Sequence, residues 1–274
     1  MCKVPTRSLL LGFLFCGLSA LAMSPALADE VAGKRLAQQV YDRADGDDMS
    51  TRGAMVLEEQ GHAPRTRQMF TYRLDKGYGE VWSLIRFTAP SDIAGTGLLT
   101  LDHADGTSDQ WVYLPALDRS RRIPAARKGG RFVGSDLVFE DLQDRKVEMD
   151  RHRLLGQETV SGVPTLMLES IPVDASNSTY GRRVSWVHQE SLLPLRIDFY
   201  APGRDDSPAK RMEVHRLEQV QGIWTVMDSS VTDLGTGHRT RLVMEAVVYD
   251  QRLPESLFSS QALEDPARES AHRP

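Results

Sequence analysis

Hydrophobic positions follow two different spacings along the chain. Within residues 30–44 they recur four positions apart, at Ala32, Leu36 and Val40, which is typical of an amphipathic helix. From residue 52 onward apolar and polar residues alternate instead, and this two-residue period indicates strands with one buried face. The pattern therefore predicts an N-terminal helix followed by a β-rich domain.

About eleven segments carry the strand pattern, and turn signals such as Asp75-Lys76-Gly77 separate them. The expected strands are residues 66–74, 78–87, 97–103, 109–114, 145–155, 163–171, 182–188, 195–200, 210–220, 223–233 and 238–249. Strands spaced this evenly predict a mainly β fold with one large antiparallel sheet that is curved or barrel-like.

One segment, residues 115–142, interrupts the strand pattern. Gly129 and Gly130 predict a flexible point in it. Ser135 is suited to cap a short helix over residues 136–142, because acidic residues follow in the first turn. A short helix on a mobile loop over a curved sheet predicts a lid above a cavity.

Residues 1–28 have the three-part layout of a secretory signal peptide. Residues 1–7 are basic, residues 9–23 are apolar, and Ala26-Leu27-Ala28 has the small-residue pattern of a cleavage site. The apolar run is shorter than the ~20 residues that a membrane-spanning helix needs. The residue before Cys16 is too large for a lipid-attachment signal, so we expect cleavage after residue 28 and a protein without an anchor.

The remaining chain reads as a single domain over residues 29–263 with a disordered polar tail over residues 264–274. Both cysteines, Cys2 and Cys16, lie in the signal segment. The exported protein would enter an oxidising compartment with neither a disulfide nor a thiolate ligand. We therefore expect a periplasmic protein without cysteine chemistry.

Composition and motifs argue against several function classes. The formal net charge of −5 does not suit a nucleic-acid binder, and 41% hydrophobic residues suffice for a folded core. The seven histidines are scattered, and neither a nucleophile elbow nor a phosphate-binding glycine loop occurs. Residues 102–106 lack the acidic spacing of a calcium loop. We expect no enzyme, cofactor or metal site, although a Ser/His/Asp triad assembled in space stays open.

A cluster of basic residues stands out from this acidic chain. It consists of Arg119, Arg121, Arg122, Arg127, Lys128 and Arg131. One interpretation is a solvated, charge-decorated loop. The other is a docking site for anionic headgroups or an acidic partner.

Three motifs resemble one family. Residues 88–102 (TAPSDIAGTGLLTLD), 110–123 (QWVYLPALDRSRRI) and 130–142 (GRFVGSDLVFEDL) occur in this order. Together they closely resemble the outer-membrane lipoprotein-sorting, LolA-like proteins of Gram-negative envelopes, in an exporter-associated branch. The resemblance covers roughly residues 55–263.

The resemblance implies an incomplete, half-open antiparallel β-barrel with a hydrophobic concave face closed by helices. It also implies a monomeric periplasmic carrier of lipid or acylated lipoprotein cargo, without catalytic residues. An inner-membrane exporter and an outer-membrane acceptor are the implied partners. The alternative is a lipid-sensing or regulatory accessory protein of an inner-membrane resistance-nodulation-division type exporter or of an envelope complex, and the cargo, a lipoprotein, a free lipid or a peptide signal, stays open.

The large apolar residues of the strands and the lid segment are the candidates for lipid contact, since methionine and aromatic linings adapt to irregular apolar ligands. For each of them an ordinary core position is the alternative. The candidates are Phe70, Tyr72, Trp82, Ile85, Leu99, Trp111, Tyr113, Leu137, Phe139, Met167, Trp186, Phe199, Met227 and Met244.

Overall fold

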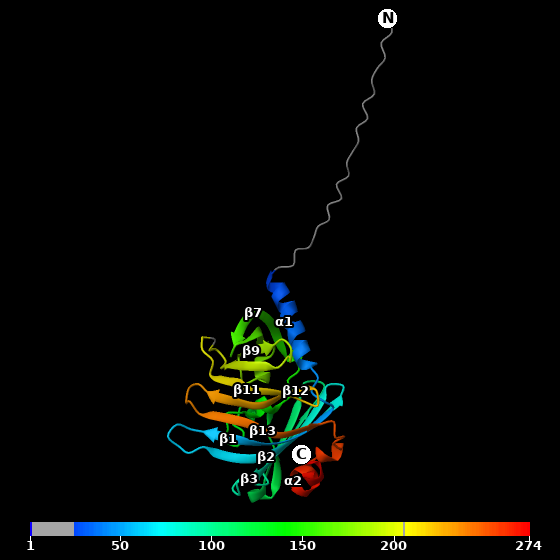
Figure 1. Ribbon diagram of the computed structural model, residues 1–274, viewed down its shortest axis with the longest axis vertical. Helices are drawn as coiled ribbons and strands as arrows, with labels where there is room; N and C mark the ends of the chain where they lie inside the picture. The colour runs from blue at the N-terminus through cyan, green and yellow to red at the C-terminus, as the bar shows by residue number, and fades with distance from the viewer. Residues whose placement is uncertain (2–24, 205) are drawn as a thin grey trace.

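The computed structural model describes Met1 and residues 25–204 and 206–274. An N-terminal helix, α1, spans Pro25–Tyr41 and packs against the far end of a large β-sheet (Figure 1). The expected helix over residues 30–44 is therefore present and begins earlier. Most of the predicted signal peptide lies outside the described residues, and residues 25–28 belong to α1.

One 13-stranded antiparallel sheet forms the body of the molecule. Its strands are β1 (Asp48–Glu58), β2 (Arg65–Gly77), β3 (Glu80–Ala89), β4 (Gly97–Asp102), β5 (Ser108–Leu114), β6 (Arg119–Arg122), β7 (Asp150–Val160), β8 (Val163–Pro172), β9 (Arg182–His188), β10 (Pro194–Tyr200), β11 (Lys210–Val220), β12 (Ile223–Asp233) and β13 (Arg239–Tyr249). Two of them, β1 and β6, were not among the expected strands, and β7 lies five residues later than expected.

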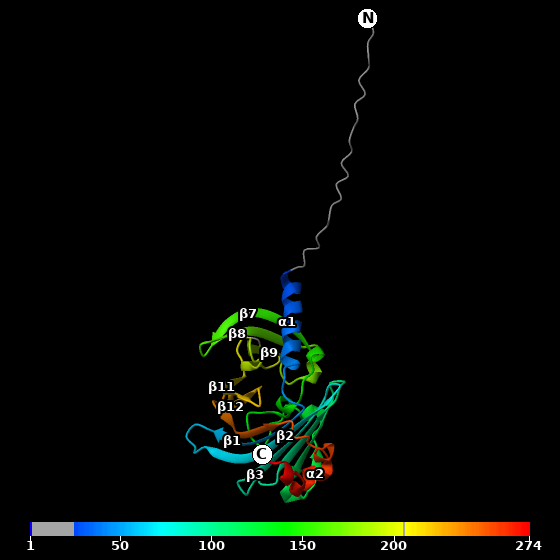
Figure 2. The same cartoon turned by 45° about the vertical axis from the view of Figure 1, so that its right-hand side comes forward.

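The order of the strands leaves the sheet open. It runs β6-β5-β4-β3-β2-β1-β13-β12-β11-β10-β9-β8-β7, so β6 and β7 are the two edges. These edge strands are consecutive in sequence, and the chain between them, residues 123–149, must therefore cross from one edge to the other. We call residues 123–149 the crossover segment. The expected half-open antiparallel barrel is confirmed, and Figure 2 shows the curvature of the sheet.

Alternate side chains point to the two faces of the sheet, and residues paired across strands share a face. On the inner face the crossover segment packs against a cluster that includes Met55, Phe87 and Leu98, with Phe132 of the crossover segment at its centre. The same face of β7 and β8 receives α1, whose Leu36 packs with a second cluster. The concave side is thus covered by two different segments.

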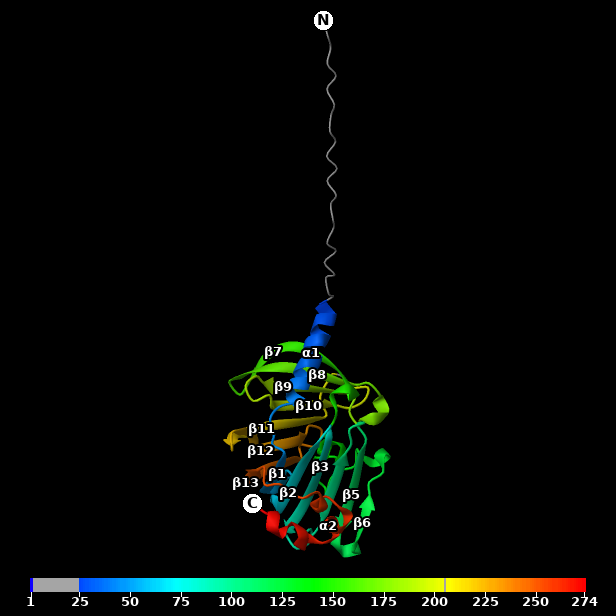
Figure 3. The ribbon, with the colours of Figure 1, turned by 90° about the vertical axis from the view of Figure 1, so that its right-hand side faces the viewer.

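The outer face of β2–β5 is covered as well, by the C-terminal end of the chain (Figure 3). Helix α2 (Ser260–Glu264) and a 3₁₀ helix (Pro266–His272) lie there. Glu269 is buried against Arg86, and both side chains are 1% exposed. The expected disordered tail over residues 264–274 is therefore wrong, because a buried ion pair fixes this polar segment to the sheet.

The predicted lid helix over residues 136–142 is shorter than expected. Only Phe139–Leu142 is helical, as a 3₁₀ turn. Ser135 does not cap it: the Ser135 hydroxyl donates to the Phe132 carbonyl at 2.7 Å and accepts from the Leu137 N–H at 3.2 Å. Its hydrogen-bonding capacity is used inside the preceding turn, which leaves Asp141 to accept the N–H of Val138 at 2.8 Å.

Candidate functional site

A cavity of about 410 Å³ lies between the crossover segment and the inner face of β9–β13. This volume lies within the range of small-molecule sites. Leu137 contributes from the crossover segment. The apolar residues from the sheet are Ile197, Phe199, Met212, Val214, Val226, Val231, Leu242 and Met244. They come from four neighbouring strands, β10–β13, and give the cavity an aliphatic floor.

Charged residues lie along one side of this floor. Lys210 of β11 forms an ion pair of 2.5 Å with Asp141 of the crossover segment. The Tyr180 hydroxyl donates to Asp141 at 2.8 Å and also contacts Lys210. Burial, followed by the charge of Asp141, strongly raises the pKa of Tyr180, so its phenol stays protonated and can donate.

Glu140, the residue before Asp141, fixes the crossover segment to the β8–β9 loop. Its carboxylate accepts the Ser178 hydroxyl at 2.5 Å, and it accepts the backbone N–H and the hydroxyl of Thr179 at 2.6 and 2.8 Å. Such a buried carboxylate with several donors is expected to hold its position firmly. Glu140 and Asp141 thus hold the 3₁₀ turn Phe139–Leu142 at two points, one on the β8–β9 loop and the other on Lys210 of β11.

A third carboxylate attaches the earlier part of the crossover segment. Asp136, whose side chain is 1% exposed, contacts His238 Nδ1 at 2.6 Å and accepts the Thr240 hydroxyl at 2.7 Å. Arg131 donates to the same carboxylate at 2.6 Å. The crossover segment therefore rests on β13 through Asp136 and on β11 through Asp141.

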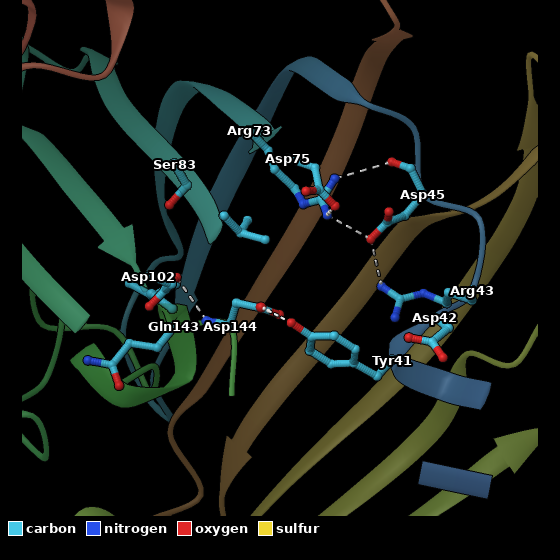
Figure 4. A pocket seen from close by; sticks show the side chains of 12 residues that line it. Tyr41, Asp42, Arg43, Asp45, Arg73, Asp75, Ser83, Asp102, Gln143 and Asp144 are labelled. Atoms are coloured by element: carbon cyan, nitrogen blue, oxygen red, sulfur yellow. Dashed lines mark hydrogen bonds and ion pairs between the residues drawn. The ribbon is translucent and has the colours of Figure 1, made fainter. Parts of the chain in front are cut away.

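A second pocket, of about 360 Å³, opens where α1 ends beside β2–β4 (Figure 4). Its lining is mostly charged: Arg73 is 3.0 Å from Asp45, and the Tyr41 hydroxyl donates to Asp144 at 2.8 Å. Asp102 accepts the backbone N–H of Asp144 at 3.0 Å. This charged pocket does not suit an alkyl chain, so the aliphatic cavity is the better candidate for a lipid.

Asp102 should make the stability of the protein depend on pH. Burial raises the pKa of its carboxyl to about 6. Between about pH 4 and pH 6 the folded state therefore keeps a proton that the unfolded chain has released, and stability falls as pH rises through this window. A shift of about two pKa units corresponds to about 3 kcal/mol.

Asp102→Asn isolates this contribution, since it keeps an oxygen for the Asp144 N–H. We expect urea unfolding to show that the variant gains about 2 kcal/mol relative to wild type between pH 4.5 and pH 7.5, because part of the effect is already present at pH 4.5. If the free energies of unfolding of the variant and the wild type differ by the same amount at both pH values, the raised pKa of Asp102 is contradicted.

The structure brings only some of the predicted lipid-contact residues to the cavity. Leu137, Phe199 and Met244 line it. Ile85 and Phe139 pack against the inner cluster that contains Phe87 and Phe132. Met227 belongs to a separate cluster, against which Met244 packs.

The other candidates do not line this cavity. Phe70, Tyr72, Trp82, Leu99, Trp111 and Tyr113 lie on the outer face of β2–β5, under the C-terminal segment. Met167 and Trp186 pair across β8 and β9, next to the inward residues Leu168 and Val187, and so they also face outward. A one-residue offset along a strand moves a side chain to the other face.

Several cavity residues were missed. Ile197 alternates with Phe199, and Met212 with Val214, so the two-residue period could have identified these pairs. The charged residues Arg145, Arg183 and Lys210 also line the cavity. They carried no distinctive motif, since each lies on a different element.

The basic cluster divides between two places. Arg119, Arg121 and Arg122 lie on the edge strand β6, where exposed charge protects an unpaired edge, and Arg122 forms an ion pair with Asp109. Arg127, Lys128 and Arg131 belong to the crossover segment. Lys128 donates to the Ser176 carbonyl at 2.8 Å, and Arg131 bonds Asp136, so these two support the crossover segment itself.

Within residues 25–204 and 206–274, no helix has the length and apolar character to cross a membrane. In the same part of the chain, no three His, Cys, Asp or Glu side chains are grouped to hold a metal ion.

An open antiparallel sheet with an apolar cavity under a crossover segment defines the class of LolA-like, carrier-type folds. A crystal structure of a Vibrio parahaemolyticus domain named for outer membrane lipoprotein sorting has a TM-score of 0.81 at 30% identity, over 86% of this chain and 100% of that one. A DUF1329 family protein from Desulfovibrio piger has a TM-score of 0.80 at 32% identity, over 86% and 99%.

The chain belongs to the DUF1329 family, and its similarity to the Vibrio parahaemolyticus domain confirms the resemblance to LolA-like proteins seen in the sequence. A family model described as one of uncharacterized proteins matches residues 79–265. A LolA superfamily protein from Nitrosomonas europaea shares the fold, with a TM-score of 0.64 at 18% identity over 85% of this chain and 99% of that one. No curated protein matches the chain.

Proposed function

We propose that this protein is a soluble periplasmic carrier that binds the acyl chain of a lipid or lipoprotein and moves it toward the outer membrane. The observation that carries the proposal is the aliphatic cavity of about 410 Å³ beneath the crossover segment. The relative from Vibrio parahaemolyticus, whose name refers to lipoprotein sorting, supports the same class of cargo.

The energetics of such a carrier need no chemical step. Burying one methylene group is worth about 0.8 kcal/mol, so a sixteen-carbon chain gains on the order of 12 kcal/mol in either a bilayer or an apolar cavity. The free energy of the alkyl chain therefore differs little between the donor membrane, the carrier and the acceptor membrane. Movement of the crossover segment would supply the difference between binding and release.

Native mass spectrometry of the protein purified from the periplasm tests the proposal. We expect bound mass that is lost on delipidation, and subsequent uptake of a fluorescent fatty acid. Val214→Trp fills the cavity and should reduce uptake at least about tenfold, because the alkyl chain loses several methylene contacts. Leu155→Trp is the matched control, since Leu155 is exposed on β7.

A ligand-free protein that takes up no fatty acid would contradict the carrier proposal. So would equal uptake by the Val214→Trp and Leu155→Trp variants.

The exposed arginines of β6 are the part of the basic cluster that we propose to dock on anionic membranes or partners. A basic residue near an anionic surface contributes about 1 kcal/mol. Arg119→Glu with Arg121→Glu should therefore lower binding to phosphatidylglycerol-containing vesicles at least about tenfold in flotation assays. Arg151→Glu with Arg153→Glu, on the other edge strand, is the control, and an equal loss in both variants would argue against docking through β6.

A further inference from the structure

Three cations reach the wall of the aliphatic cavity. They are Arg145 from the crossover segment, Arg183 from β9 and Lys210 from β11. Phe199 of β10 pairs with Arg183 on one side and with Lys210 on the other, so Arg183, Phe199 and Lys210 lie in one row on the inner face. We call the three lining cations, Arg145, Arg183 and Lys210, the cationic row.

Among the residues that line the cavity, cations outnumber carboxylates. The lining holds these three cations and two carboxylates, Glu140 and Asp141, whereas the whole chain carries a net charge of −5. A third carboxylate, Asp150, pairs with Arg145 and Arg183 but does not line the cavity. A cavity made only to hold alkyl chains would not need buried cations, because each costs hydration free energy.

Arg145 and Arg183 share a single carboxylate. Asp150 accepts Arg145 Nε at 2.9 Å and Nη2 at 2.8 Å, and it also accepts from Arg183. Glu140 is 4.0 Å from Arg145, and its oxygens already accept bonds from the β8–β9 loop. Burial lowers the pKa of the Arg183 guanidinium, as expected for a cation whose lost hydration is incompletely replaced.

We propose that Arg145, Arg183 and Lys210 form a subsite for the anionic headgroup of a single-chain amphiphile. The alkyl chain would lie on the aliphatic floor, and a carboxylate or phosphate would lie against the cationic row. Guanidinium groups suit both anions, because their parallel N–H groups match two oxygens. This inference rests on the proposed function and specifies its ligand class.

The subsite also connects ligand binding to the crossover segment. Lys210 is already paired with Asp141, which lies on the 3₁₀ turn above the cavity. An anion that reaches Lys210 competes with Asp141 for the same ammonium group. Binding of the headgroup therefore weakens one of the contacts that hold the crossover segment closed.

Three ligands with one alkyl chain test the headgroup directly: tetradecanoic acid, tetradecyl phosphate and tetradecanol. Each is titrated against the full chain loaded with a pyrene-labelled dodecanol, and displacement of this neutral probe is measured. We expect the anions to displace it at about tenfold lower concentration than the alcohol, since charge-assisted hydrogen bonds add about this factor. Whichever of the two anions binds more tightly shows whether the subsite prefers a carboxylate headgroup or a phosphate headgroup.

Arg183→Met is the test variant, because Asp150 keeps its two bonds from Arg145 and is not left unpaired. In this variant the ratio of alcohol to anion affinity should fall toward one. Tetradecanol has no charge to pair with Arg183, so most of the change in this ratio should come from weaker binding of the anions.

Arg211→Met is a matched control. Arg211 shares Asp198 with Arg196, in the same arrangement of two arginines on one carboxylate. Asp198 lies between the cavity residues Ile197 and Phe199 and so faces the opposite side of the sheet. The control should keep the full preference for anions.

Two results would overturn the headgroup subsite and leave the carrier proposal standing. One is equal binding of anion and alcohol by the wild-type protein. The other is an unchanged preference in Arg183→Met. Failure of the probe and of all three ligands to bind would overturn both proposals.

Discussion

Arg86→Met should lower the free energy of unfolding by about 3–5 kcal/mol, the usual cost of removing one partner from a buried ion pair. Arg86 lies on the outer face of β3 and is fully buried. Its guanidinium donates to the carbonyls of Ala262 and Leu263 at 3.0 and 2.7 Å, and it pairs with Glu269. The substitution leaves these buried acceptors without their donor.

The loss of stability should be specific to this contact, because Arg86 holds the C-terminal segment over the apolar cluster of β2–β5. Burial raises the pKa of Glu269 and the Arg86 charge lowers it, so the pKa of this carboxyl should rise further when Arg86 is removed. Urea unfolding of Arg86→Met measures the loss. A second variant, Arg86→Met with Glu269→Gln, should recover part of it, since the buried carboxylate, which then has only the half-buried Arg273 as a partner, is gone.

Arg268→Met is the matched control from the same segment. Arg268 is half exposed and lies 3.4 Å from Asp265, a surface pair that contributes little. Its substitution should change stability by less than about 1 kcal/mol. Equal losses in Arg86→Met and Arg268→Met would show that the C-terminal segment does not depend on the buried pair.

Local spacing was enough to predict the sheet and the N-terminal helix. The two-residue period marks most strands, because each has at least one buried face. β6 was missed because its residues, Arg119–Arg122, are nearly all charged, as suits an exposed edge. The open barrel itself followed from the family resemblance and not from the spacing.

The assignment of faces could not be predicted in the same way. In β3 the outward Leu84 and the inward Phe87 are both fully buried, because the C-terminal segment covers one face and the crossover segment the other. Alternation separates two sets of residues only where one set is polar. The sequence pattern therefore points to the outer set as cavity lining as readily as to the inner set.

The charged wall of the cavity could not be predicted from the sequence, for a different reason. Arg145, Arg183 and Lys210 come from three elements, and only the strand order brings them together. The polar tail was misjudged similarly: its composition suggested disorder, although the single buried Glu269 fixes it to Arg86. Contacts between distant segments decide such features, and spacing along the chain does not encode them.

Asp141→Asn should release the crossover segment while the sheet stays folded. Asp141 is 9% exposed and pairs with Lys210, which is 10% exposed, so the variant leaves a largely buried ammonium without its counter-ion. The usual cost of such a loss is about 3 kcal/mol or more. Amide exchange in residues 137–143 should then accelerate about a hundredfold, and the bound pyrene-labelled dodecanol, a neutral probe that does not pair with Lys210, should dissociate faster.

Asp144→Asn is the matched control, because Asp144 contacts Lys146 and Tyr41 just as Asp141 contacts Lys210 and Tyr180. Asp144 is 29% exposed and lies in the charged pocket, so solvent can replace much of its interaction. Its substitution should leave dissociation of this neutral probe near the wild-type rate. Equal rates for the two variants would mean that Asp141 does not hold the crossover segment over the cavity. Faster dissociation in Asp141→Asn alone would identify the Lys210–Asp141 pair as the contact that retains the ligand.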